Sequence, residues 1–280
     1  MAHKRVLTIQ DYSCLGRCSL TVAQPIISSC LIECVALPSC ILSNHTQFKK
    51  WKISDLTNYM IPFTSMWDDY NLFFDGIYTG YLLDTQIDNT ISIIKKLKKD
   101  SSIVIVDHAM ADDNKLYPGF NNEHIEKVKK LISFGDIIIP NRSELAFLTN
   151  NEVKDNYSET EIRSMLTSLS DNNKKKIILT GIKKNNYNYT YLYNNGIIQE
   201  FKTKNYSGKY HGCGDLFAST FTGSFLQTKD YAKSIKIALK VTSISIENTL
   251  KENLDGMLYG VNFEQSIPYL SRKLKHYSKI

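Results

Sequence analysis

Several features that would place the chain in a familiar class are missing from it. No apolar run reaches the roughly 18 residues that a membrane span needs. The first five residues lead into a strand-like run and lack the apolar core of a secretion signal. We therefore expect a cytoplasmic protein without membrane contact. With 280 residues and 42% hydrophobic content, the chain has enough apolar material for one core, and we expect a single domain over 1–280.

Neither a disulfide scaffold nor a zinc site is indicated by the cysteines. Five of the six lie in the first 40 residues, and without a secretion signal they are expected to be reduced thiols. Cys14 and Cys18 are four residues apart, but no second Cys/His pair nearby completes a zinc set. The net charge is +6, and its lysines stand in short runs at the ends of apolar segments. That pattern indicates solvated helix ends, so no nucleic-acid partner is expected.

The usual kinase signatures are also absent. There is no glycine-rich loop ending in Gly-Lys-Ser/Thr, and the protein-kinase motifs are missing. What the chain does contain is the glycine turn Gly212-Cys213-Gly214, followed by Asp215 where a helix is expected to begin. N–H groups at a helix N-terminus favour negative charge, and a carboxylate beside them can serve as a base. The turn indicates phosphoryl transfer to an alcohol, with a simple capped helix as the alternative.

Short apolar runs alternate with longer amphipathic ones. The pattern predicts strands at 6–9, 34–37, 76–78, 103–106, 137–139 and 177–180. It predicts helices at 20–31, 53–70, 84–98, 123–133, 144–148 and 159–169. A hairpin at 187–193 and 197–202 is expected around Asn194-Asn195-Gly196, followed by helices at 215–226, 231–251 and 263–275. This alternation predicts an α/β fold with a mostly parallel sheet and helices on both faces.

Polar residues follow several of the predicted strands. Ser13 follows the first, Asp107 ends another, and Asn141 with Glu144 follows Pro140. Thr180-Gly181 end a fifth strand. Parallel sheets bind ligands beyond the carboxyl ends of their strands, so we expect these residues to gather into a site. The alternative for each one taken separately is a turn or helix cap.

The order and spacing of these segments resemble the pyridoxal kinase branch of the ribokinase-like superfamily over nearly the whole chain. The resemblance rests on the first turn (Asp11, Ser13, Gly16), Ser43-Asn44-His45-Thr46, Gly80-Tyr81, Asp107 to Asp112, Lys115-Leu116-Tyr117, Pro140-Asn141 with Glu144, Thr180-Gly181, and Gly212 to Asp215. It implies a ribokinase-like three-layer sandwich, phosphorylation of the 5′-hydroxymethyl group of vitamin B6 vitamers, and a homodimer. It further implies the use of ATP and Mg²⁺, and allows for a monovalent cation.

The family pattern also implies roles for individual residues. Asp215 is expected to take the proton from the substrate hydroxyl, while the Gly212–Gly214 turn, through the N–H groups of Cys213 and Gly214, holds the phosphate. The positions that match the vitamer site are Ser13, His45, Thr46 and Tyr81. Those that match the ATP site are Asp107, Asn141, Glu144, Thr180 and Gly181. The implied metal positions are Asp107, Asp112 and Glu144.

The acidic loop departs from that pattern. The family's usual Asp-Pro-Val-Met-Gly-Asp is here Asp107-His108-Ala109-Met110-Ala111-Asp112, so both acids are kept while the loop shape is left open. The segment 113–122 that follows is polar and contains Pro-Gly, and we expect a mobile lid that keeps water out. An ordinary surface loop is the alternative.

Cys213 stands where threonine is commoner in the family. A helix N-terminus lowers the pKa of a thiol, and thiols add reversibly to aldehydes. A hemithioacetal with pyridoxal is therefore one hypothesis for Cys213. The alternative is a small residue that fits a tight turn.

Two rival functions stay open. A hydroxymethylpyrimidine (phosphate) kinase has the same fold, although such enzymes commonly carry Cys at the end of the glycine turn, where this chain has Asp215. A non-catalytic small-molecule sensor is the other rival, and the intact acidic residues argue against it.

Overall fold

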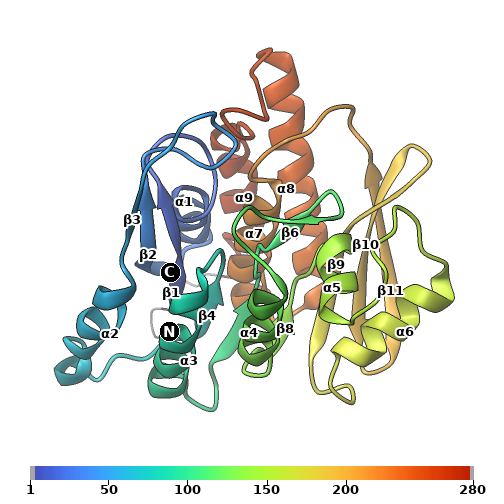
Figure 1. Cartoon of the computed structure of the whole chain (residues 1–280). Coiled ribbons are helices and arrows are strands. Elements are labelled where there is room, and N and C mark those ends of the chain that lie inside the picture. Colours follow the sequence, from blue (N-terminus) through green and yellow to red (C-terminus); the bar gives the residue numbers. More distant parts are fainter. Residues whose placement is uncertain (1–3, 278–280) are drawn as a thin grey trace.

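A nine-stranded, mostly parallel sheet forms the centre of the computed structural model, which describes residues 4–277 (Figure 1). Residues 1–3, part of the segment judged for a secretion signal, lie outside this range. The strand order is β11-β10-β9-β8-β5-β4-β1-β2-β3. Its members are β1 (Arg5–Ser13), β2 (Glu33–Leu42), β3 (Ile53–Asp55), β4 (Gly76–Thr79), β5 (Ile103–Val106), β8 (Ile137–Ile138), β9 (Lys176–Lys184), β10 (Tyr187–Asn194) and β11 (Ile197–Lys204). Six neighbouring strands are parallel to one another, in the sheet order β9-β8-β5-β4-β1-β2. Strands β10 and β11 at one edge and β3 at the other add antiparallel pairs.

Helices cover both faces of this sheet (Figure 1). One buried cluster joins the sheet to α2 (Thr57–Ser65), α3 (Asp84–Leu97), α4 (Asn122–Ile132), α5 (Arg142–Leu148) and α6 (Glu159–Leu169). The other joins it to α1 (Leu20–Ser29), α7 (Cys213–Thr228), α8 (Tyr231–Lys251) and α9 (Ile267–Leu274). The order of layers is therefore helix, sheet, helix, as predicted.

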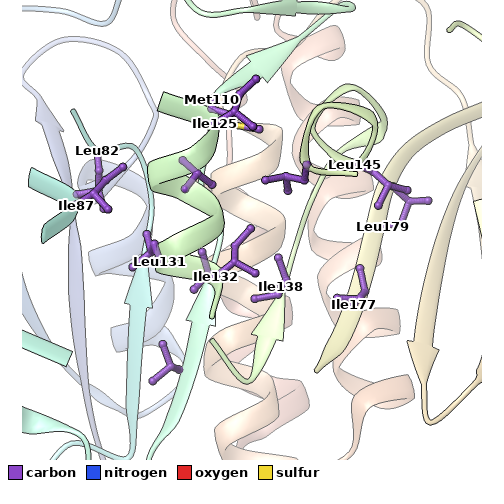
Figure 2. Packing of buried hydrophobic residues seen from close by; sticks show 14 of the residues in the cluster. Leu82, Ile87, Met110, Ile125, Leu131, Ile132, Ile138, Leu145, Ile177 and Leu179 are labelled. Carbon is purple, nitrogen blue, oxygen red and sulfur yellow. The ribbon is translucent and has the colours of Figure 1, made fainter. Parts of the chain in front are cut away.

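The sequence pattern explains the two clusters. Strand β5 alternates between them, because Val104 and Val106 face one cluster and Ile105 faces the other. A strand buried on both faces has to be apolar throughout. On α3, Ile87, Ile91 and Ile94 recur at helical spacing and are all buried. Figure 2 shows side chains of α4 gathered against those of β8 and β9.

Most of the predicted elements are confirmed, including the hairpin of β10 and β11, but the helix predicted over 53–70 is wrong at its start. Residues 53–55 instead form β3, which pairs antiparallel with residues 40–42 of β2. Helix α2 begins only at Thr57, whose N–H donates to the Asp55 carboxylate at 2.8 Å. A free sheet edge offers backbone hydrogen bonds that local helical periodicity does not reveal. A separate 3-10 turn at Asp68–Tyr70 completes the segment.

Strand β1 is also longer than expected and brings the first polar turn into the sheet. It pairs with β2 as far as Ser13 and Leu42, with an irregularity between Gln10 and Tyr12. Ser13 is therefore the last residue of the strand and is fully buried. Within residues 4–277, no helix combines the length and apolar character that crossing a membrane would require.

Parallel register brings the predicted polar residues to one edge of the sheet. Asp107 follows β5, and its N–H donates to the carbonyl of Thr79, at the end of the neighbouring β4. Beyond β8, Asn141 forms an isolated parallel bridge with Thr180 of β9. These groups and the end of β1 all lie at the carboxyl edge, where parallel sheets form their ligand sites.

We expect the cluster shown in Figure 2 to dominate stability. Replacing the fully buried Ile138 by alanine should lower the free energy of unfolding by about 3 kcal/mol, since a cavity adds to the lost burial. The matched control is Ile197→Ala, because Ile197 is 71% exposed and its truncation should cost less than about 0.5 kcal/mol. Urea unfolding measures both values, and equal losses in the two variants would contradict this assignment of the core.

Candidate functional site

The glycine turn at the start of α7 has a shape that only glycine permits. Gly212 has a positive φ of 76°, and a Cβ there would lie 2.1 Å from the carbonyl oxygen of Arg17. A Cβ on Gly214 would meet nothing within 4 Å, so the space beside that residue is open. The first N–H groups of α7 have no acceptor inside the helix. The turn therefore directs backbone N–H groups that have no acceptor within the helix toward an open space, as an anion site requires.

Asp215, in the first turn of α7, has an environment suited to a base. Its side chain is only partly exposed. Burial raises its pKa to about 7, a backbone hydrogen bond from Ser19 opposes the shift, and the nearby Asp11 adds to it. A carboxylate with a pKa near neutrality can accept a proton and still be ionised at pH 7. The structure thus gives Asp215 a property that its position in the sequence alone did not fix.

Two further carboxylates of the site, those of Asp107 and Glu144, also have raised pKa values. Burial, Glu144 and Asp215 together raise the pKa of Asp107 well above its usual range. Burial raises the pKa of Glu144 to about 7, although three backbone N–H groups oppose the shift. Like charges gathered in a poorly solvated place destabilise the ionised forms, so this edge of the sheet favours a bound cation or a donor-rich ligand.

Glu144 also fixes the acidic loop, whose shape the sequence left open. One carboxylate oxygen accepts the N–H of Met110 at 2.9 Å, and the other accepts the N–H of Asn141 at 2.9 Å. The Asn141 side chain donates in turn to the carbonyl of Ala111 at 2.7 Å. Met110 is fully buried and reaches the core near Ile125 (Figure 2). The loop therefore keeps a defined shape without the family's proline and glycine.

No preassembled metal site results from these contacts. Among residues 4–277, no three His, Cys, Asp or Glu side chains come together as a metal cluster. Glu144 uses both oxygens on backbone N–H groups, and Asp112 is exposed. Asp107 is the residue of the three whose buried carboxylate fits a cation best. That donor set suits Mg²⁺ held by one or two carboxylates together with nucleotide phosphates.

Of the predicted acceptor residues, His45 is engaged elsewhere. One ring nitrogen lies 2.8 Å from the carbonyl of Leu258, so it carries the proton and donates. The other accepts the N–H of Gln47. The ring stacks on His211 with centroids 4.1 Å apart, and a Cβ on Gly16 would collide with it. His45 therefore holds three loops together, and neither of its ring nitrogens is left for a ligand in this structure.

The other acceptor positions differ in availability. The hydroxyl of Ser13 donates to Asp11 at 3.1 Å, so it has only lone pairs left to offer. Thr46 is exposed. The ring of Tyr81 is stacked on Phe120 at 5.5 Å between centroids, and Phe120 stacks on His124. Phe120 belongs to the predicted lid, so the lid lies over the aromatic platform that Tyr81 provides.

Side chains from the rest of the molecule hold that lid segment. It follows β6 (Ala111–Asp112) and contains β7 (Lys115–Leu116), and these two strands pair as a small hairpin. Asp113 forms an ion pair with Lys209, which lies just before the glycine turn. The N–H of Asn114 donates to the Ser143 hydroxyl at 3.0 Å. The segment therefore spans from the acidic loop to the approach to Asp215.

A cavity of about 380 Å³ opens beside the acidic loop. Its lining includes the predicted Asp112, Asn141 and Gly181. It also includes Arg142 and Lys183, two cations that sequence reasoning missed. Both stand next to predicted residues, Arg142 after Asn141 and Lys183 two residues beyond Gly181, and that adjacency was the available signal. Asp113 and Asp155 also line the cavity, and Arg142 forms an ion pair with Asp155 at 3.3 Å, so the lining carries both signs of charge.

The expectation that Cys213 has a lowered pKa is wrong. Burial and the neighbouring Asp215 raise the pKa of this thiol to about 12. The effect of a helix N-terminus is small beside the cost of placing a second negative charge next to a buried carboxylate. Cys213 is thus a neutral thiol that fits the turn, and the basis of the hemithioacetal hypothesis is removed.

Comparison with known proteins gives a consistent result. The sequence profile of the phosphomethylpyrimidine kinase family matches residues 40–257. A putative phosphomethylpyrimidine kinase from Bacteroides thetaiotaomicron, solved with pyridoxal, is 30% identical, with 96% of each chain covered and a TM-score of 0.90. The pyridoxal kinase of Dictyostelium discoideum is 29% identical over 78% of this chain and 77% of that protein. Pyridoxal kinase from Leishmania donovani, solved with ADP and pyridoxamine, covers 99% of this chain and 97% of its own at 18% identity and a TM-score of 0.79, which shows the fold alone.

Asp215 should make the protein less stable at alkaline pH. Its pKa is raised from 3.8 to about 7 on folding, so its contribution to stability is present below pH 4 and lost as the pH rises through 7. We expect Asp215→Asn to raise the free energy of unfolding at pH 8 by on the order of 2 kcal/mol, allowing for partial exposure. The gain should vanish towards pH 4. Urea unfolding at both pH values tests this, with the exposed Asp100→Asn as control, and a destabilised Asp215→Asn at pH 8 would contradict it.

Proposed function

The chain belongs to the family of pyridoxal and phosphomethylpyrimidine kinases and has their ribokinase-like fold, and we propose that it transfers the γ-phosphoryl group of ATP to the 5′-hydroxymethyl group of a vitamin B6 vitamer. The observation that carries the proposal is Asp215, whose pKa is raised to about 7, directly after a glycine turn with open space beside it. A base and an anion site side by side are what transfer to an alcohol requires.

The geometry supports a simple division of tasks. Asp215 takes the proton of the substrate's hydroxymethyl group. The hydroxymethyl oxygen forms a bond to the γ-phosphorus of ATP, and the bond between that phosphorus and the β-phosphate oxygen breaks. The N–H groups of Cys213 and Gly214 bind the transferring phosphoryl oxygens. Arg142 and Lys183 line the cavity for the remaining phosphates. Bound Mg²⁺ supplies charge neutralisation on those phosphates, and Asp107 is the residue that would hold it.

The lid and the first turn complete the acceptor site. The ion pair between Asp113 and Lys209 holds the segment across the site, which excludes water from the phosphoryl group. For a flat heteroaromatic ring, Tyr81 offers a stacking surface once Phe120 moves aside. Ser13 offers lone pairs to a polar edge of the ring. His45 acts by holding the surrounding loops.

Hydroxymethylpyrimidine phosphorylation is the second candidate within the same family. It is favoured by the family profile over residues 40–257. Asp215 favours the vitamer reaction, since pyrimidine kinases commonly carry cysteine at this position, and the pyridoxal-bound relative from Bacteroides thetaiotaomicron adds support. The two candidates differ in acceptor, so one assay separates them.

We expect the purified protein with Mg-ATP to place phosphate on the 5′-hydroxymethyl group of pyridoxal, pyridoxine or pyridoxamine. Asp215→Asn should lower that turnover by about 100-fold or more, the scale of a lost general base, while Asp100→Asn keeps it. Product analysis by mass spectrometry and phosphorus NMR gives the site of transfer. Turnover of hydroxymethylpyrimidine with none of any B6 vitamer would instead assign the protein to the second candidate.

A homodimer is part of the proposal, because one edge of the molecule exposes an apolar stripe. Tyr59 and Phe63 on α2 and Met66 directly after it recur at helical spacing and are all exposed, Met66 by 68%. The neighbouring edge strand β3 is exposed throughout. An apolar stripe beside an open strand edge is suited to a second copy of the chain.

We expect the protein to sediment as a dimer at micromolar concentration and Phe63→Glu to sediment as a monomer, since a charge would be buried in the interface. The control is Ile197→Glu, at the opposite edge of the sheet, which should remain dimeric. Analytical ultracentrifugation measures all three proteins. A monomeric parent protein would rule out this surface as a dimer interface.

A further inference from the structure

Tyr78, the third residue of β4, lies among the carboxylates of the site although no role follows from its place in the sequence. It is fully buried, and its phenol donates to Oδ2 of Asp107 at 3.4 Å. On the other side, Ser219 lies near the phenol, but its hydroxyl has no hydrogen-bond partner among the described residues. Ser219 lies four residues after Asp215, one turn further along α7. The phenol thus lies between the loop after β5, to which it donates, and the helix that carries Asp215.

A tyrosine hydroxyl in this place has to serve a polar partner. Tyr78 packs within the buried cluster that contains Ile105, Leu216 and Phe221, where phenylalanine would fill nearly the same volume. An unpartnered hydroxyl in such surroundings is unfavourable. A phenol is protonated at neutral pH and donates, and Oδ2 of Asp107 is the acceptor that it reaches.

We propose that Tyr78 is a positioning residue, which holds the Asp107 carboxylate through Oδ2 in the orientation in which it would bind Mg²⁺ together with the nucleotide. The inference rests on the proposed function, since it concerns the same site. Asp107 follows directly on the end of β5, and its carboxylate has the Tyr78 phenol as a side-chain donor. Groups that orient a metal-binding carboxylate typically change metal affinity or activity by 10- to 100-fold when removed.

Tyr78→Phe is the first test, read out by metal binding as well as turnover. We expect the Mn²⁺ affinity of the enzyme–ADP complex, measured by electron paramagnetic resonance, to fall about tenfold. The kcat should fall by a similar factor, and the KM for pyridoxal should stay unchanged, because Tyr78 acts through Asp107 and does not touch the acceptor. A structural role alone would not divide the two kinetic constants in this way.

Tyr193→Phe is the matched control. Tyr193 is likewise buried, and its phenol bonds to Thr167 at 3.2 Å and Asn173 at 2.7 Å. It lies on β10, away from the acidic loop. Both variants should lose stability to a similar extent, since each loses a buried hydrogen bond, but the control should keep its Mn²⁺ affinity and kcat. A Tyr78→Phe protein that behaves like the control would overturn the proposal.

Asp107→Asn provides the second test through a double-mutant cycle. If Tyr78 acts through Asp107, adding Tyr78→Phe to Asp107→Asn should change Mn²⁺ affinity no further. Additive losses would show that Tyr78 acts by another route and would also overturn the proposal. The cycle is independent of the acceptor: a parent protein that phosphorylates no B6 vitamer rejects the proposed function, while the Mn²⁺–ADP measurements still decide the role of Tyr78.

Discussion

The gathering of carboxylates at one edge of a parallel sheet is the constraint on which the rest of this site depends. Asp107, Glu144 and Asp215 are each held where water solvates them poorly, and each has a raised pKa. Such an arrangement opposes folding, and the protein offsets the cost with backbone N–H groups around Glu144 and a phenol beside Asp107. The same strain makes Asp215 a competent base, which illustrates how stability is exchanged for activity.

Around these carboxylates, loops from distant parts of the chain hold one another in place. His45 is packed against Gly16, bonded to the carbonyl of Leu258 and stacked on His211. Gly212 approaches the backbone of Arg17 so closely that a side chain would not fit. The glycine turn is therefore shaped by the first turn as much as by its own residues. The acidic loop at Ala111 is likewise shaped by residues outside it. Hydrogen bonds with Glu144 and Asn141 set its shape, so it tolerates a sequence that differs from the family's.

Prediction from the sequence succeeded for structure that depends on neighbouring residues in the chain. It failed where a residue's conformation or environment depends on segments far away in the sequence. The hairpin around Asn195-Gly196 and the α/β alternation follow from turn chemistry and periodicity. The start of the helix expected from residue 53 is instead a strand at the sheet edge, because its pairing partner on β2 lies ten or more residues away in the sequence. Arg142 and Lys183 were missed since their common cavity arises only when β8 and β9 lie side by side. The assigned roles of the predicted site residues remain predictions.

By itself the sequence determined the alternation of strands and helices, the glycine turn before Asp215 and the family pattern of acids. Apolar spacing and glycine placement suffice for these, because they act within a few residues. The tertiary structure alone decided which polar atoms already have hydrogen-bond partners, as both ring nitrogens of His45 do, and which groups have shifted pKa values. It placed Tyr78 beside Asp107 and raised the pKa of Cys213 where the local rule lowers it. The pKa of a group depends on its burial and on the charges around it, and both come from segments throughout the fold. A short stretch of sequence therefore does not determine it.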